Sequence, residues 1–388
     1  MLDYQTFLES RRRRASEPLA IEPAVAVEQL RTPTLFVDAD ILEANLARMQ
    51  DTLASAGLGL RCHTKTHKCP ELARRQLAAG AVGVCCAKVG EAEAMVDAGV
   101  EEVLITSPIA TSDSAARVVA LAAAAPVRIV VDSLPGAALL EDAARAAATT
   151  VGVLIDLDPG MGRTGIAPGS ALELAQQMAE QCPNLRFDGL QLYAGNCMHI
   201  EGWQTRFDQY RRTLEAGHEV VTAFAAAGIA TPIITGGGTG TWDMEAGLGL
   251  FTDVQAGSYV FMDAEYMAIG DRNGVVFADF EPSLFVLVTA ISQPQSSKLT
   301  FDGGYKAFAT DTVKPVFADL EGVRFHWGGD EHGIVALENP SAHVAPRARL
   351  AMITPHCDPT VNLYDDLVVV RDGRAVEIWP IAGRGRSQ

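Results

Sequence analysis

Residues 127–157 read VRIVVDSLPGAALLEDAARAAATTVGVLIDL, an apolar run, an alanine-rich segment and a second apolar run. Val127–Asp132 and Val151–Leu157 are apolar over almost their whole length, as strands buried on both faces of a sheet are. Pro135–Ala147 between them has the length and the composition of a helix. A strand, a helix and a second strand in this order predict two parallel strands joined by a crossover helix.

The same alternation runs from residue 58 to residue 260 and predicts eight strands, each followed by a helical segment. The predicted strands are 58–62, 82–87, 103–106, 127–132, 151–157, 187–193, 233–235 and 254–260. Eight strand–helix units in roughly 200 residues favour closure into a (β/α)8 barrel. A doubly wound open sheet is the alternative architecture.

The segments outside this alternation predict a second, mostly β domain. After about residue 270 the alanine-rich helices stop, and five short strand-like segments follow, namely 284–292, 298–301, 350–354, 366–371 and 375–378. Asp372-Gly373, between the last two, is a hairpin turn signal. We assign Thr34–Val37 to the same β domain. We therefore expect residues 1–57 to contribute a strand and lead into the barrel, residues 58–270 to form the barrel, and residues 271–388 to form the β domain.

The net charge and the cysteine content of the chain limit the molecules that it is expected to bind and the compartment in which it is expected to work. The chain has 388 residues and a formal net charge of −17. A surface of this charge repels nucleic acid and anionic lipid, so we expect neither partner. Seven cysteines, an odd number, with no recognisable secretion signal predict a reduced, cytoplasmic protein. Arg11–Arg14 is expected to be a solvated basic arm, because the apolar segment of a signal peptide does not follow it.

A lysine between two histidines follows the first predicted barrel strand, in the run His63-Thr64-Lys65-Thr66-His67. Barrel enzymes carry their chemistry at the carboxyl ends of the strands. Burial and nearby positive charge lower the pKa of a lysine, which makes its amine nucleophilic. Such a lysine can form an imine with an aldehyde cofactor, so Lys65 predicts an enzyme that uses pyridoxal 5'-phosphate (PLP).

Two segments predict a phosphate site at the same end of the barrel. Gly236-Gly237-Gly238-Thr239-Gly240 follows the seventh strand, and Gly257-Ser258-Tyr259 ends the eighth. Glycines let backbone N–H groups converge on an anion, and barrel phosphate sites commonly use the loops after strands seven and eight. A glycine-rich turn that binds nothing is the alternative interpretation.

Three further residues belong to the strand ends of the predicted barrel. Arg163 is presented by the glycine-rich loop Asp158–Gly165, where it can donate a charge-assisted hydrogen bond to a phenolate oxygen. A surface arginine in a turn would look the same. Tyr193 ends the sixth strand, and His199, six residues later, is a candidate base for a substrate hydroxyl.

His356-Cys357-Asp358 is the candidate metal motif of the β domain. In an extended backbone positions i and i+2 face the same side, so His356 and Asp358 can bind one ion while Cys357 points away. One nitrogen and one oxygen donor suit Mn²⁺, Mg²⁺, Co²⁺ or Zn²⁺, and two protein ligands leave positions for water and substrate. A histidine satisfied beside a turn aspartate is the alternative.

Taken together, these motifs resemble the D-threonine aldolase / D-serine dehydratase family of fold-type III PLP enzymes, whose barrel is similar to that of bacterial alanine racemase. The likeness runs from about residue 32 to the end and includes Asp330–Gly333. It implies a Schiff base on Lys65, Arg163 at the phenolate oxygen, Tyr193 near the ring, phosphate contacts from Gly238, Thr239, Ser258 and Tyr259, and a divalent metal on His356 and Asp358.

The chain departs from its relatives' patterns at two positions. Gln255 stands where the racemases carry an arginine that faces the pyridine nitrogen, so the protonation of the cofactor ring is open. Asp358 stands where D-serine dehydratases of the family usually have a cysteine. The aspartate is closer to the D-threonine aldolase and D-3-hydroxyaspartate aldolase members.

The resemblance implies a metal-dependent aldolase that cleaves D-β-hydroxy-α-amino acids to glycine and an aldehyde. Its base would be His199, His67 or metal-bound water. A dehydratase that converts D-serine, D-threonine or 3-hydroxyaspartate to a 2-oxo acid and ammonia is the main alternative, followed by a racemase and by a cofactor-binding protein without turnover. A homodimer is expected, because barrels of this family often pair near their active sites.

Overall fold

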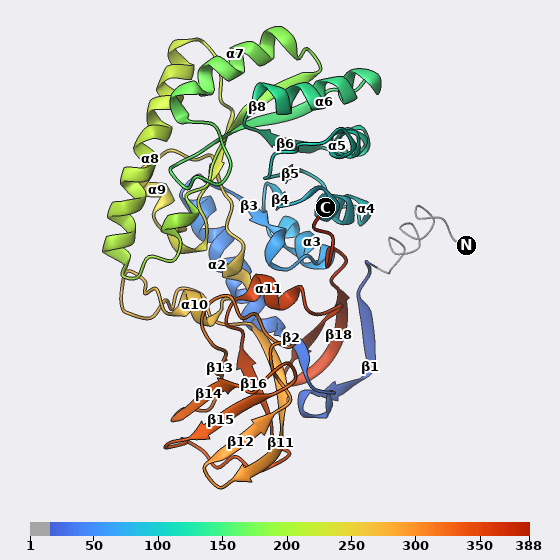
Figure 1. Cartoon of the computed structure of the whole chain (residues 1–388), viewed down its shortest axis with the longest axis vertical. Coiled ribbons are helices and arrows are strands. Elements are labelled where there is room, and N and C mark those ends of the chain that lie inside the picture. Colours follow the sequence, from blue (N-terminus) through green and yellow to red (C-terminus); the bar gives the residue numbers. More distant parts are fainter. Residues whose placement is uncertain (1–15) are drawn as a thin grey trace, which may run out of the picture. The chain divides into compact units, whose positions relative to one another are not determined.

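The computed structural model describes residues 16–388, which form two compact units (Figure 1). The barrel unit comprises residues 48–65, 72–257 and 385–388. The strand-rich unit comprises the described residues up to 47, together with 66–71 and 258–384. Arg11–Arg14, the predicted basic arm, lies outside the described residues.

The barrel unit contains a closed barrel of parallel strands in the order β10-β3-β4-β5-β6-β7-β8-β9. These strands are β3 (Gly59–His63), β4 (Gly83–Cys86), β5 (Val103–Ile105), β6 (Val127–Val131), β7 (Val151–Leu157), β8 (Leu185–Leu192), β9 (Ile233–Gly236) and β10 (Asp253–Val254). The predicted (β/α)8 barrel is therefore confirmed, and the open sheet is excluded.

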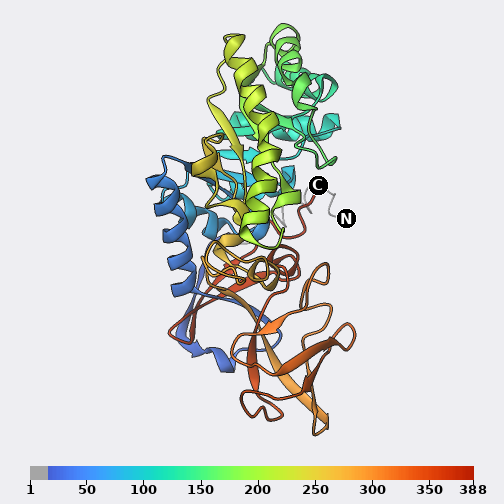
Figure 2. The same cartoon turned by 90° about the vertical axis from the view of Figure 1, so that its left-hand side faces the viewer.

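Helices between the strands lie on the outside of the barrel, and Figure 2 shows the longest of them, α8, along its side. They are α3 (Pro70–Ala78), α4 (Val89–Asp97), α5 (Ser112–Ala124), α6 (Leu134–Ala146), α7 (Ala171–Gln181), α8 (Trp203–Ala226) and α9 (Glu245–Leu248). Local sequence sets their starts: Thr111 caps α5 and Ser133 caps α6, each through a side-chain oxygen that accepts a backbone N–H.

The barrel closes where its last strand, β10, pairs with its first, β3. Arg61 on β3 donates from Nε to Asp253 Oδ1 on β10 at 3.3 Å, and from Nη1 to the Glu102 backbone oxygen at 3.3 Å. Thr235 on β9 also donates to Asp253. The side chains of Arg61 and Asp253 are only 5% and 6% exposed, so this is a buried ion pair at the seam of the barrel.

Ten strands of the strand-rich unit form one sheet within residues 16–388, with the main order β1-β18-β17-β2-β11-β12-β15-β14. They are β1 (Leu19–Ala26), β2 (Thr34–Asp38), β11 (Leu284–Gln295), β12 (Lys298–Phe301), β13 (Val316–Phe317), β14 (Val323–Trp327), β15 (Gly333–Leu337), β16 (Arg349–Ile353), β17 (Asp366–Arg371) and β18 (Arg374–Pro380). The unit also holds α10 (Ala264–Met267) and α11 (Cys357–Val361).

The early strand β2 lies inside this sheet, as predicted, between β17 and β11. Phe36 of β2 stacks on Phe285 of β11 with ring centroids 5.3 Å apart, in one core cluster. Asp372 and Gly373 join β17 to β18, and both have positive φ, as a two-residue hairpin requires.

Three expectations about the elements were wrong or incomplete. The predicted strand 254–260 is a strand only at Asp253–Val254, and Ser258–Val260 forms a short 3₁₀ helix, η6. The helix α2 (Ala39–Ser55) was not predicted, although Leu42, Leu46, Met49 and Leu53 form a buried stripe along it. Strands β1, β13, β14 and β15 were also missed, and each of them is short or half-exposed.

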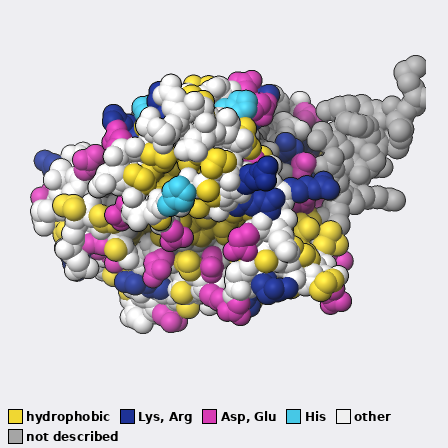
Figure 3. Space-filling model, turned by 90° about the horizontal axis from the view of Figure 1, so that it is seen from below, with side chains coloured by type: hydrophobic (Ala, Val, Ile, Leu, Met, Phe, Trp, Pro, Cys, Tyr) yellow, Lys and Arg dark blue, Asp and Glu magenta, His cyan; other side chains and the backbone are white. Residues whose placement is uncertain are grey.

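Side-chain exposure is consistent with a well-packed chain. All seven cysteines lie within the described residues, and all are buried and outside any disulfide. On the face shown in Figure 3, acidic and basic side chains are interspersed among hydrophobic ones. No helix within residues 16–388 combines the length and the apolar character needed to cross a membrane.

Replacing Arg61 with methionine should destabilise the protein by about 3–5 kcal/mol, because Asp253 would stay buried without its cation. The double variant Arg61→Met/Asp253→Asn should regain much of this loss, since it removes the unpaired charge and keeps an acceptor for Thr235. Thermal unfolding of both variants measures the effect. If Arg61→Met unfolds at the wild-type temperature, the ion pair is not what secures the seam.

Candidate active site

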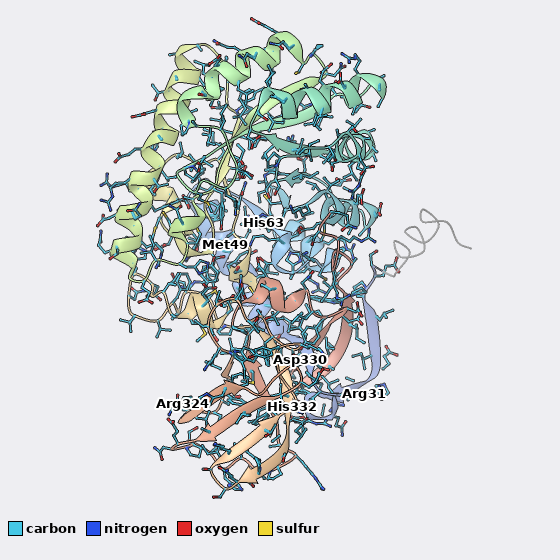
Figure 4. All side chains as sticks on the ribbon, viewed as in Figure 1. Arg31, Met49, His63, Arg324, Asp330 and His332 are labelled. Carbon is cyan, nitrogen blue, oxygen red and sulfur yellow. The ribbon has the colours of Figure 1, made fainter. Side chains whose placement is uncertain are left out.

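Lys65 lies at the carboxyl end of β3, in the short 3₁₀ helix η2 (Thr64–Thr66), and is half-buried. The preceding His63, labelled in Figure 4, accepts the Lys65 backbone N–H at Nδ1 over 3.4 Å. Its Nε2 is 3.2 Å from Thr106 Oγ1. A neutral ring that accepts at Nδ1 carries its proton on Nε2. In that tautomer His63 orders the backbone at Lys65 by accepting its N–H.

His67 repeats this pattern in the strand-rich unit. It is buried, and its Nδ1 accepts the Cys69 backbone N–H at 3.1 Å. Its ring meets Phe261 edge-on, with ring centroids 6.5 Å apart. By the same reasoning its proton sits on Nε2, so this tautomer of His67 can donate a hydrogen bond from Nε2, and Nδ1 is already used as an acceptor.

Arg163 and Tyr193 come together above the barrel strands. The Arg163 guanidinium carbon lies 5.4 Å from the centroid of the Tyr193 ring, a cation–π distance. The loop that presents Arg163 is organised by Asp158, whose Oδ1 accepts the backbone N–H groups of residues 160–162 at 2.8–3.1 Å. Arg163 itself is exposed, so it is available to a ligand oxygen.

The glycine run Gly236–Gly240 is buried and packs tightly. A Cβ at Gly236 would lie 2.0 Å from the Leu192 carbonyl oxygen, and one at Gly240 would lie 2.1 Å from the Met198 carbonyl oxygen. Close packing therefore requires these two glycines whether or not a phosphate binds. The helical segment expected after the seventh strand is only the four-residue α9, preceded by a 3₁₀ turn at Thr239–Thr241. An anion here would rest on backbone N–H groups rather than on a helix dipole.

A buried carboxyl group lies directly behind this run and was not anticipated from the sequence. Glu245 Oε1 accepts from Tyr210 Oη at 2.8 Å and from Thr241 Oγ1 at 2.7 Å. Within the described residues its other oxygen, Oε2, is buried without a hydrogen-bond partner. Burial raises the pKa of Glu245 to about 8, against the opposing hydrogen bonds from Thr241 and Tyr210. At neutral pH this carboxyl is mostly protonated, so it adds little negative charge behind an anion site.

Gln255 and the η6 residues complete the predicted cofactor contacts. Gln255 is buried after β10, and its Nε2 donates to Gln191 Oε1 at 3.1 Å in the barrel unit. Gly257 is the last residue of this segment of the barrel unit. Ser258 and Tyr259 are buried in the strand-rich unit, where Tyr259 packs edge-on against Phe280 at 5.6 Å.

The backbone expected for the metal motif was wrong in part. His356 is extended, with φ −141° and ψ 122°, but Cys357–Val361 is the helix α11. Asp358 therefore lies in the first turn of a helix, and strand alternation does not bring it to His356. The negative charge of Asp358 nevertheless acts on the His356 ring. Burial lowers the pKa of His356, but Asp358 and a hydrogen bond with Asp311 outweigh it, so the pKa is raised above its ordinary value.

Two aspartates outside the predicted motif hold it in place. Asp263, fully buried, accepts the Cys357 backbone N–H at 2.9 Å through Oδ2 and caps α10 through Oδ1. Asp311 Oδ2 lies 2.8 Å from His356 Nδ1. A carboxylate bonded to one ring nitrogen fixes the tautomer and leaves Nε2 as the metal-binding atom.

The donor set fits a hard or borderline divalent ion, with one ring nitrogen from His356 and one carboxylate from Asp358. In the described part of the chain no three or more His, Cys, Asp or Glu side chains gather as a metal site. Neither supporting aspartate carried a signal in the sequence, because each contacts the motif across 45 or more positions.

Two other predicted residues lie in exposed turns. His199 follows the 3₁₀ turn Gly195–Cys197 and is exposed. Asp330, labelled with His332 in Figure 4, belongs to the turn between β14 and β15, where Lys306 pairs with Glu331 at 2.6 Å and with Asp330 at 3.6 Å.

Glu245→Gln should stabilise the protein increasingly as pH rises from about 5 to about 8.5. The folded state holds a proton on Glu245 that the unfolded chain releases above its ordinary pKa of about 4.5, so wild-type stability falls across this window and levels off above about 8. Glutamine keeps the acceptor for Tyr210 and Thr241 and cannot ionise. Calorimetric melting temperatures across the window measure the difference. Glu219→Gln, an exposed change on α8, is the control, and equal pH profiles for wild type and Glu245→Gln would contradict this assignment.

Asp311→Ala should weaken Mn²⁺ binding about 10- to 100-fold, because His356 would lose the partner that orients its ring. Electron paramagnetic resonance of free Mn²⁺ during a titration gives the dissociation constant directly. Asp319→Ala, which removes an exposed aspartate of the same unit, should leave it unchanged. Identical affinities in the two variants would show that Asp311 does not support the ligand.

Known proteins match this chain over nearly its whole length. Residues 37–265 match the family described as alanine racemase, N-terminal domain, and residues 283–370 match a serine dehydratase domain. D-threonine aldolase of Arthrobacter sp. is 36% identical over 371 residues, 96% of this chain and 97% of that protein. 3-Hydroxy-D-aspartate aldolase of Paracoccus denitrificans (strain Pd 1222) is 33% identical over 369 residues, 94% of this chain and 95% of that protein.

A solved structure agrees with these sequence matches. The crystal structure of D-threonine aldolase from Filomicrobium marinum matches with a TM-score of 0.89 and 36% identity, over 93% of this chain and 98% of that chain. The family resemblance inferred from the sequence motifs is confirmed.

Proposed function

Because the chain belongs to the family that contains D-threonine aldolase and D-serine dehydratase, we propose that it is a PLP- and divalent-metal-dependent aldolase. It cleaves D-β-hydroxy-α-amino acids to glycine and an aldehyde. The observation that carries this proposal is the set of residues at the carboxyl ends of one closed barrel. These are Lys65, Arg163, Tyr193, the glycine run after β9, and Gln255.

The residues of the barrel unit fit the cofactor's chemical groups. Lys65 would hold the aldehyde carbon, Arg163 the phenolate oxygen, and the backbone of Gly238 and Thr239 the phosphate. The neutral state of Glu245 fits a phosphate in front of it, because an ionised carboxyl would repel the anion. When bound, PLP supplies an electron sink for the bond that breaks at the α-carbon.

The strand-rich unit would supply the metal. His356 Nε2 and the Asp358 carboxylate would bind it, with Asp311 and Asp263 holding the motif. A divalent ion lowers the pKa of a bound hydroxyl, which is the group that must lose a proton. We propose Mn²⁺ as the ion among those that suit this donor pair.

Proton transfers at two substrate atoms complete the reaction. A base removes the proton of the β-hydroxyl, the Cα–Cβ bond breaks, and the aldehyde leaves. A second proton then reaches the α-carbon, from the Lys65 ammonium, to give glycine. We propose His199 as the base in preference to His67, because Nδ1 of His67 is occupied by the Cys69 N–H and its Nε2 carries the proton.

Dehydration is the second candidate function, favoured by the match of residues 283–370 to a serine dehydratase domain. It would break the Cα–H bond and release hydroxide from the β-carbon, with the metal as Lewis acid. Asp358 at the metal motif favours the aldolase.

We also propose a role for each domain, an oligomeric state and a cellular compartment for this activity. We propose that residues 58–270 act as the cofactor domain and residues 271–388 as the metal domain. We also propose that the protein works as a homodimer in the cytoplasm. Seven buried thiols, none of them in a disulfide, support a reducing compartment.

Mass-spectrometric product analysis is the test of this function. Purified protein with PLP and Mn²⁺ is offered D-threonine, D-phenylserine, D-serine and the 3-hydroxyaspartates. We expect glycine plus the matching aldehyde, which from the 3-hydroxyaspartates is glyoxylate. Lys65→Ala should lose the visible absorbance of the lysine-bound cofactor together with turnover, and His356→Ala should lose turnover and metal dependence.

Three results would change the conclusion. Ammonia and a 2-oxo acid would establish the dehydratase. A His356→Ala protein that stays fully active without metal would contradict the metal's role. Lack of turnover with every D-amino acid offered would leave a cofactor-binding protein.

A further inference from the structure

Three buried polar side chains form a continuous chain across the barrel unit. Gln255 Nε2 donates to Gln191 Oε1 at 3.1 Å, and Gln191 Nε2 donates to Asp156 Oδ1 at 2.8 Å. The three residues are 4%, 3% and 3% exposed. Asp156 belongs to β7, Gln191 to β8, and Gln255 follows β10, so the chain links three strands of one barrel.

The orientation of Gln191 in this chain is determined by its neighbours. Its Nε2 also donates to the Thr106 backbone oxygen at 3.2 Å. The Thr106 carbonyl oxygen and the ionised Asp156 carboxylate can only accept hydrogen bonds. Both amide hydrogens of Gln191 are therefore donated to these two acceptors. If the Gln191 amide were flipped, its Oε1 would face the Thr106 oxygen and Asp156, which are both acceptors. Gln191 therefore presents Oε1, an acceptor, to Gln255.

The orientation of the Gln191 amide also determines that of the Gln255 amide. Facing an acceptor, Gln255 must donate from Nε2, which makes its carbonyl oxygen Oε1 the other polar end of the relay. The two amide dipoles then point the same way, with their negative ends away from the carboxylate, and hydrogen bonds in series polarise one another. A relay that starts at a carboxylate thus ends in a carbonyl oxygen.

We propose that Asp156 is a positioning residue that, through Gln191, makes Gln255 an acceptor for a protonated pyridine nitrogen of the cofactor. This inference rests on the proposed function and on the position of Gln255, which stands where the racemases carry an arginine that faces that nitrogen. An arginine at this position can only donate and would favour an unprotonated ring. The relay here favours the protonated ring, which is the stronger electron sink for breaking the Cα–Cβ bond.

Asp156 is ionised under ordinary assay conditions. Burial raises its pKa to about 6, while hydrogen bonds from Gln191 and Thr164 oppose this shift. Asp132 and Arg163 are the charged groups that face it, and they act in opposite directions. Thr164 Oγ1 donates to Asp156 Oδ2 at 3.0 Å, so each carboxylate oxygen accepts a hydrogen bond. At pH 7.5 the relay therefore begins at a negative charge.

The ¹⁵N chemical shift of ring-labelled PLP bound to the protein tests the proposal, because it separates protonated from unprotonated pyridine without reference to turnover. We expect a protonated ring in the wild type at pH 7.5. In Asp156→Asn the apparent pKa of the ring nitrogen should fall by about one pH unit or more. Gln191→Leu should cause a similar fall, because it breaks the path to Gln255 while the Asp156 side chain stays in place. Borohydride reduction and peptide mapping establish that the cofactor sits on Lys65 in each sample.

Asp132→Asn is the matched control. It removes a carboxylate at the same end of the barrel, one that accepts the Gly165 backbone N–H and takes no part in the relay. The pKa of the cofactor's ring nitrogen in this variant should stay near the wild-type value. An equal fall in Asp132→Asn, or no fall in Gln191→Leu, would overturn the relay.

The wild-type protein alone can also refute the proposal. An unprotonated ring on Lys65 would overturn the relay and leave the proposed function standing. A wild type that does not take up PLP would overturn both.

Discussion

The parallel pairing of β10 with β3 is the constraint on which the barrel unit depends, because it joins the last strand to the first. Only Asp253 and Val254 take part from β10, so few backbone hydrogen bonds close the seam. The buried Arg61–Asp253 pair, with Thr235 as a third member, ties β3, β10 and β9 together. Those three strands run directly into Lys65, Gln255 and the glycine run, so the seam sets the relative positions of the residues that would hold the cofactor.

Buried carboxyl groups serve two different purposes in this unit. Glu245 is held mostly neutral behind the glycine run, where an anion is expected, whereas Asp156 stays ionised at the start of the amide relay. The difference follows from local hydrogen bonding and desolvation. Asp156 receives hydrogen bonds on both oxygens, while Glu245 has one buried oxygen without a partner among the described residues. The same chemical group, a buried carboxyl, is thus mostly neutral at Glu245 and ionised at Asp156.

Much of the barrel could be predicted from sequence, because strands such as Val151–Leu157 are buried along their whole length and are apolar except at Asp156. Short, half-exposed strands such as β14 and β15 were missed, although residues 334–337 of β15 are apolar. The residues named for the site were chosen by position next to a strand end or within a compact motif. Asp311, Glu245 and Asp156 were not, because their roles come from contacts across 35 or more positions or from burial that periodicity does not reveal.

The reactivity of the seven buried thiols can be used to follow local opening of the structure. A thiol reacts with an alkylating reagent as the thiolate, and burial raises the pKa of Cys85, Cys86 and Cys357 well above the ordinary range. Each of these side chains is therefore protected until the segment around it separates from its neighbours. Cys357 lies between the two proposed metal ligands, whereas Cys85 and Cys86 lie on β4 of the barrel. Labelling rates at these positions would compare the motions of the metal motif and of the barrel wall within one molecule.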